Sequence, residues 1–135
     1  ILAAVAIPKL AATRDDADAA VCVQEIGQLV SEITAHYTKV GNRQFTNDNV
    51  SKMTNITTNS SATRGIKADG KVHGSTGITY KCDGVEIVSI KGNLINSDYF
   101  LDVTTKTGSS AASIKAINAT KNNILNGNTT KRFKL

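Results

Sequence analysis

The sequence predicts an α+β domain in which a long N-terminal helix packs on an antiparallel sheet of about four strands. Two patterns carry this prediction: apolar residues recur at helical spacing as far as Gly41, and two alternating segments flank Asp83-Gly84. A chain of 135 residues fits one domain with a modest core. We therefore expect residues 1–41 to form the helix. Residues 42–135 should form a loop and sheet head that shares one globular domain with the C-terminal half of that helix.

The first half of the predicted helix, residues 1–13, opens with ILAAVAIPKL and is apolar on nearly all sides. Such a surface requires partners outside its own domain, because an exposed apolar patch of this kind usually marks an interface. Pro8 should kink this half, since proline removes a backbone donor and clashes with the preceding turn. The segment is too short to cross a bilayer, which takes roughly 20 apolar residues.

The second half, residues 14–41, is amphipathic. Cys22, Ile26, Leu29 and Ile33 fall on one helical face, and Gly41 followed by Asn42 provides a C-terminal stop. Together the two halves make one helix about 60 Å long at 1.5 Å per residue, which is longer than a small domain covers.

The opening ILAAVAIP resembles the N-terminal segment of type IV pilins and of the pseudopilins of type II secretion and competence systems. This resemblance implies a structural subunit rather than an enzyme, with no cofactor, that polymerises with itself and with other pilins or pseudopilins. It further implies additional apolar residues before Ile1 that anchor the chain in the bacterial inner membrane until assembly. The assembled location would then be a cell-surface pilus or a periplasmic pseudopilus.

In a pilin-like filament the apolar half of the helix would pack against neighbouring helices. The charges that follow have two interpretations: a solvated helix surface, or pairs between subunits that set the stacking register. A metal site is disfavoured, because a helix points neighbouring aspartates in different directions and no EF-hand spacing follows. The expected packing residues are Ile1, Leu2, Val5, Ile7, Pro8 and Leu10, and the charges are Lys9, Arg14, Asp15, Asp16 and Asp18.

Residues 42–77 are rich in Asn, Thr, Ser and Gly and predict an irregular connection with short pieces of structure. Residues 78–82 and 85–90 then form a predicted hairpin around the Asp83-Gly84 turn. Its expected register places Cys82 opposite Val85, Lys81 opposite Glu86 in an ion pair, and Tyr80 opposite Ile87. Further strands are predicted at residues 99–104, 112–117 and 129–135.

Cys22 and Cys82 are the two cysteines of the chain, and each falls on the apolar face of its own element. If the helix packs on the sheet, the two side chains point toward each other. A disulfide is expected in an oxidising compartment, whereas two buried, reduced thiols are the alternative, because spacing alone does not bring the Cα atoms close.

A formal net charge of +5 permits contact with nucleic acid or anionic lipid without establishing either. Aromatic residues make up 4% of the chain and tryptophan is absent, which disfavours the stacking surface of a single-strand binder. No nucleophile, zinc or phosphate-loop motif occurs. His36 is predicted to be a hydrogen-bonded structural histidine, and His73 a surface loop residue. The candidate DNA contacts are Lys131, Arg132 and Lys134 in the basic tail.

The leading hypothesis is therefore a structural subunit of a type IV pilus or pseudopilus. A competence-type minor pilin or pseudopilin that binds DNA is the first alternative, and a type II secretion pseudopilin is the second. Many major pilins place a disulfide near the C-terminus, whereas here one cysteine lies in the helix and the other at the first hairpin. Major pseudopilins of type II secretion commonly carry tryptophan and proline in a calcium-binding loop region, whereas this chain has no tryptophan and only one proline, Pro8. This second departure places the secretion hypothesis behind the pilus and competence hypotheses.

Overall fold

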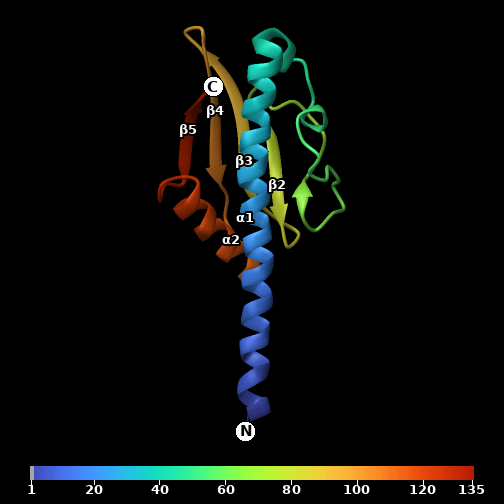
Figure 1. The fold of residues 1–135 in the computed structure, drawn as a ribbon, viewed down its shortest axis with the longest axis vertical. Helices are drawn as coiled ribbons and strands as arrows, with labels where there is room; N and C mark the ends of the chain where they lie inside the picture. Colours follow the sequence, from blue (N-terminus) through green and yellow to red (C-terminus); the bar gives the residue numbers. More distant parts are fainter. Residues whose placement is uncertain (1) are drawn as a thin grey trace.

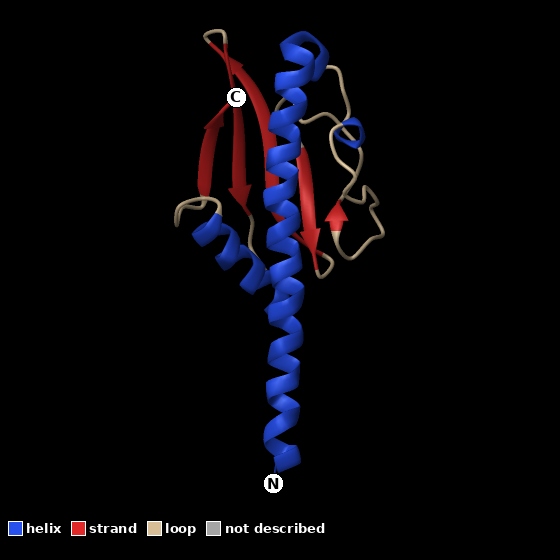
Figure 2. Cartoon of the chain, in the orientation of Figure 1, coloured by secondary structure: helices blue, strands red, loops and turns tan. Residues whose placement is uncertain are grey.

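The computed structural model describes the backbone of residues 2–135 and the side chains of residues 14–135. One long helix lies along the inner face of a five-stranded antiparallel sheet, and a second helix closes one end of the head (Figures 1 and 2). The predicted α+β class is confirmed. In chain order the elements are α1 (Leu2–Phe45), the 3₁₀ turn η1 (Val50–Lys52), β1 (Gly65–Ile66), β2 (Ile78–Cys82), β3 (Val85–Ile95), β4 (Asp98–Thr105), α2 (Ala111–Asn123) and β5 (Thr130–Lys134).

The amphipathic half of α1 buries the face that its periodicity predicts. Cys22, Ile26, Leu29 and Ile33 are at most 1% exposed, because they pack on the sheet. Gly41 interrupts the helix with a φ of 77°, a left-handed conformation that glycine adopts without strain. The predicted stop is thus a break, after which the chain resumes helical structure to Phe45.

The sheet is a meander whose strands follow the order β1-β2-β3-β4-β5, each antiparallel to the next. Side chains alternate along β4, so that its inner residues are buried under α1 and its outer residues remain partly exposed. The outer face is polar and charged. The buried residues that the sheet contributes to the core include Ile66, Ile78, Tyr80, Ile87, Val88, Ile90, Leu101 and Val103.

The hairpin register is confirmed at the turn and wrong beyond it. Cys82 pairs with Val85 and Lys81 with Glu86, but Tyr80 pairs with Val88, because a bulge inserts Ile87 into β3. The bulge places both Ile87 and Val88 in the core. The predicted ion pair between Lys81 and Glu86 is also wrong.

Neighbouring groups explain the missing ion pair. The Lys81 ammonium donates to the Ser60 carbonyl over 2.6 Å, under the irregular segment that covers the strand. Glu86 is instead held by Lys67 at 3.0 Å and Lys106 at 3.2 Å.

Residues 112–117, predicted as a strand, belong to α2. The Ser110 hydroxyl accepts from the Ser113 backbone N–H while Ser113 reaches back, a reciprocal cap that satisfies the first turn of a helix. Ala112, Ala116 and Thr120 are buried at intervals of four residues, which is the spacing of a helix and not of a strand.

The predicted irregular connection contains η1 and β1 and packs largely through isolated apolar side chains. Val50, Ile66 and Val72 are fully buried, and the Val50 N–H donates to the Gly70 carbonyl over 2.8 Å. The segment therefore forms part of the core despite having little regular structure (green in Figure 1).

Candidate functional site

The N-terminal part of α1 extends past the lower end of the sheet and past α2, and no other described element lies beside it (Figure 1). The expected packing residues, Ile1, Leu2, Val5, Ile7, Pro8 and Leu10, fall in this part, as does Lys9. Their side chains lie outside those that the structure describes, so their predicted packing stays a prediction. The backbone of α1 therefore extends beyond the head, and no other described element covers it there.

A disulfide fixes α1 to the sheet where the helix enters the head. Cys22 and Cys82 are bonded with a Cα–Cα distance of 6.0 Å, and both are almost fully buried. Of the two alternatives for the cysteine pair, the structure has the disulfide. It closes a loop with a sequence separation of 60 residues, so it restricts the unfolded chain strongly.

A second link joins α1 to β2 one helical turn further along. The Tyr80 hydroxyl donates to Glu25 Oε1 over 2.5 Å, and Arg64 lies 3.5 Å from the same oxygen. Burial, and then the neighbouring Glu25 carboxylate, raise the pKa of Tyr80 far above its usual value. The Tyr80 phenol therefore stays protonated and donates to the Glu25 side chain where the helix meets the sheet.

The charges that follow the protruding half lie at the base of the head. Asp16 pairs with Lys115 of α2 at 2.7 Å, so this aspartate serves the fold of its own chain. Within residues 14–135, Arg14, Asp15 and Asp18 make no ion pair, and Arg14 and Asp18 are exposed. These three remain available to a partner, as the inter-subunit interpretation requires.

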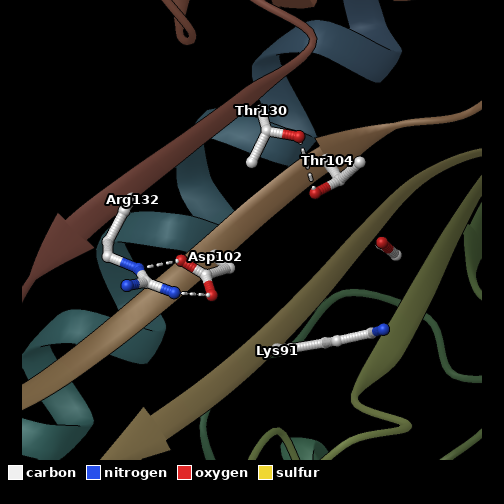
Figure 3. Close-up of a pocket in the computed structure, with 6 residues that line it drawn as sticks. Lys91, Asp102, Thr104, Thr130 and Arg132 are labelled. Atoms are coloured by element: carbon white, nitrogen blue, oxygen red, sulfur yellow. Dashed lines mark hydrogen bonds and ion pairs between the residues drawn. The ribbon is translucent and has the colours of Figure 1, made fainter. Parts of the chain in front are cut away.

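The outer face of the sheet carries a shallow hollow lined by Ser89, Lys91, Asp102, Thr104, Thr130 and Arg132 (Figure 3). Arg132 donates from Nε and Nη2 to the two Asp102 carboxylate oxygens over 2.7 and 2.9 Å, which is bidentate geometry. This pairing keeps the Asp102 pKa below its usual value. The amine of Lys91 points away from the pair in Figure 3.

The structure does not bring the three candidate DNA contacts together. Arg132 and Lys134 lie on the outer face, where Lys134 is 3.5 Å from Asp98. Lys131 lies on the opposite side of β5, with its amine 4.8 Å from the centre of the Phe133 ring. Since Arg132 is neutralised by Asp102, the tail offers less positive charge than its sequence suggests.

Both histidines have structural partners. His36 Nε2 lies 2.8 Å from Asp48, as expected for a hydrogen-bonded structural histidine, and Gln44 donates to the same carboxylate over 2.7 Å. The prediction for His73 was incomplete, because its ring lies 2.9 Å from the Tyr99 hydroxyl. Gly92 makes room for this contact, since a Cβ there would collide with the Tyr99 side chain.

The residues that the structure describes contain no group of three or more His, Cys, Asp and Glu side chains placed to hold a metal ion. No helix among them combines the length and the apolar character needed to cross a bilayer. Comparison of the whole chain with family models, curated proteins and solved structures finds no match.

Some features of the head could not be predicted from the sequence. Glu25 and Tyr80 are 55 positions apart, and their contact depends on the sheet register. Leu94 and Ile95 end β3 as exposed apolar residues, where a hairpin turn at Asn96-Ser97 was detectable only from two turn-forming residues in a row.

Proposed function

We propose that this protein is a structural subunit that polymerises through the N-terminal half of α1, as the subunit of a type IV pilus or pseudopilus. The observation that carries the proposal is the uncovered helix. The segment that is apolar on nearly all sides projects from the head, and no other described element covers it (Figure 1). A helix with this surface is stable in water only where something covers it.

Assembly of like helices would supply that cover. Burial of apolar surface contributes about 25 cal/mol per Å², so several large side chains per subunit give a substantial driving force. The same geometry repeated from copy to copy, without closing, produces a filament. The disulfide between Cys22 and Cys82 supports this role, because it holds the head rigidly on the helix that carries it.

The pilin assignment adds two features to this physical argument. The ILAAVAIP opening resembles pilins and pseudopilins, and the helix-on-sheet architecture is the fold that the resemblance implies. The proposed partners are further copies of this chain and other pilins or pseudopilins. The proposed location is the bacterial inner membrane before assembly and the pilus or periplasmic pseudopilus afterwards.

Substitution of Val5 tests the proposal in cells that produce the whole precursor. Val5→Asp places a charge in the apolar half and should abolish fibres in the sheared surface fraction, while the protein level in the membrane stays unchanged. Gln24→Asp is the matched control, because it adds the same charge to an exposed position of α1 within the head. Fibres from Val5→Asp at wild-type yield would rule out helix packing as the basis of assembly.

Capture of DNA by a minor pilin is the second candidate, and the observation that favours it is the cationic outer face. Lys91 has no ion-pair partner among residues 14–135. Lys67 and Lys106 lie on the same face and share one carboxylate, that of Glu86, which leaves an excess of positive charge there. The affinity of the purified chain for duplex DNA should then fall steeply between about 50 and 200 mM salt. A plot of the logarithm of the binding constant against the logarithm of the salt concentration should have a slope of roughly −0.9 per phosphate contact. Lys91→Gln should reduce that slope, and an absence of binding at low salt would exclude this candidate.

A further inference from the structure

The disulfide between Cys22 and Cys82 borders a small hollow in the surface of the head. Neither cysteine is more than 1% exposed, yet both line this hollow, which has a volume of about 90 Å³. A space of this size is large enough for several water molecules. The other residues that line it are Asp18, Thr63, Arg64 and Asp83. On this side, surface residues rather than the core separate the disulfide from solvent.

The cover on this side includes the strap, which we define as residues 57–64 of the irregular connection beside β2 (green in Figure 1). The two ends of the strap are joined: the Ile66 N–H donates to the Thr57 carbonyl over 2.7 Å, and the Asn59 N–H donates to the Ile66 carbonyl over 3.0 Å. Gly65 permits this closure, because a Cβ there would collide with the Thr57 carbonyl oxygen. Since its ends are already joined, the strap can move without separating β1 from β2.

Polar contacts hold the strap on the head. The strap, all of which the structure describes, contributes no buried side chain. Its contacts with α1, β2 and the turn after β2 are Arg64 Nε to Glu25 at 3.5 Å, Lys81 Nζ to the Ser60 carbonyl at 2.6 Å, and the Gly84 N–H to the Thr63 carbonyl at 2.8 Å. A segment with few buried apolar contacts opens at a lower free-energy cost than the whole domain unfolds.

The other surroundings of the disulfide belong to the core. Ala19 and Ile26 lie three residues before and four residues after Cys22, on the same face of α1, and are at most 4% exposed. Tyr80, two residues before Cys82, is fully buried. Access from these sides would require α1 to separate from the sheet, so the strap is the part of the cover that can open by itself.

We propose that the disulfide is a site of thiol–disulfide exchange in the folded head, which small thiols reach when the strap opens. A thiolate of the reagent attacks one cysteine sulfur, the S–S bond breaks, and the other cysteine leaves as a thiolate that takes up a proton. With a dithiol, the second thiol of the reagent then displaces the first cysteine. The reagent ends as a cyclic disulfide and both cysteines end as thiols. This inference goes beyond the proposed function and does not depend on it.

Exchange at this site would loosen α1 near the point where it leaves the head. The disulfide is the covalent link between α1 and β2, and after its reduction the hydrogen bond from Tyr80 to Glu25 remains at this boundary. Glu25 also faces Arg64 of the strap. One carboxylate therefore takes part both in closing the strap and in attaching the helix.

Reduction of the purified, folded chain by dithiothreitol tests the site. The appearance of thiols gives the rate, which is measured at several urea concentrations below the unfolding transition. Opening of the strap exposes little surface, so the rate constant should stay nearly unchanged across this range. A rate that rises with urea as steeply as unfolding does, or no reduction below the transition, would overturn the proposal, because the disulfide would then react only in the unfolded chain.

Arg64→Ala tests whether the strap controls access. Loss of the ion pair with Glu25 should speed reduction about two- to fivefold, the range that an exposed ion pair allows. Loss of a nearby cation would by itself slow the approach of an anionic thiolate, so a faster reaction indicates opening and not a change in charge.

Lys67→Ala is the matched control for this variant. The Lys67 side chain is 51% exposed, against 48% for Arg64, and it pairs with Glu86 without lining the hollow. Its loss should leave the reduction rate at the wild-type value. Equal rates for the two variants would overturn the proposal, because the strap would then have no part in access to the disulfide.

Discussion

The two halves of α1 belong to one continuous element but have different environments. From Cys22 to Ile33 the helix presents a single apolar face, which the sheet covers and whose side chains are at most 1% exposed. The half before residue 14 is apolar on nearly every side, and its backbone runs on beyond the head. The first pattern is what a domain requires from a helix, and the second is what a filament requires.

This difference separates folding from assembly. Substitutions in the buried half should change the free energy of unfolding of the head, whereas matched substitutions in the protruding half should change fibre yield and leave the head intact.

Loss of the disulfide should have the largest effect on the head. A Cys22→Ser, Cys82→Ser double variant loses the restraint on a loop with a separation of 60 residues, at a cost of about 4 kcal/mol in the chain-entropy model. Urea unfolding followed by circular dichroism measures the difference. Wild-type protein treated with reductant should match the variant, and an unchanged midpoint in both samples would show that the disulfide contributes nothing.

Leucine truncation compares the two halves directly. Leu29 is fully buried, so Leu29→Ala should lower the free energy of unfolding by about 3 kcal/mol through lost burial and a cavity. Leu10→Ala in the protruding half should change it by less than about 0.5 kcal/mol. Equal losses measured by urea unfolding would mean that the protruding half folds with the head, against the division drawn above.

Removal of the Tyr80 hydroxyl should have a smaller effect at the point where helix and sheet meet. Tyr80→Phe deletes the donor to Glu25 and should cost about 1.5 kcal/mol, the magnitude of a hydrogen bond to a charged group. Tyr37→Phe is the control, because Tyr37 is also packed against the core without a hydrogen bond at this boundary. A loss of the same size in both variants would assign the effect to removal of a tyrosine hydroxyl in general rather than to the link with Glu25.

The smallest effect is confined to acid pH. Hydrogen bonds from His36 and Gln44 hold the pKa of Asp48 below its usual value of 3.8, so its stabilising contribution is present above about pH 4 and is lost as pH falls through the lower pKa of the folded state. Asp48→Asn should therefore unfold at a lower urea concentration than wild type at pH 7, with a smaller gap at pH 3. Asp15→Asn should show no gap at either pH, and a gap for Asp48→Asn that grows in acid would reverse the assigned sign.

The long-range plan of the fold could be predicted because its signals repeat. Helical spacing from Cys22 to Ile33 and the Asp83-Gly84 turn each rest on several residues that agree. The facing cysteines followed from the same two patterns, although their oxidation state did not. Single features were less reliable: Ile87 looked like an ordinary strand residue, and only the paired strands show it as a bulge.

Residues 112–117 were misassigned because a short apolar segment fits both periods. The decisive signal was the Ser110 cap, which satisfies backbone donors that a strand would pair elsewhere. The candidate assembly surface was predictable only in part. An apolar helix that needs partners is visible in sequence, but the point at which that helix leaves the head depends on where α2 docks.

Immunogold electron microscopy of cells that produce this protein, with antibody against the head, tests the central claim most directly. We predict labelled fibres that disappear in a deletion strain and return when the gene product is restored. Cells that contain the protein in normal amounts but show no labelled fibre, either at the surface or in thin sections of the envelope, would contradict assembly through the N-terminal half of α1.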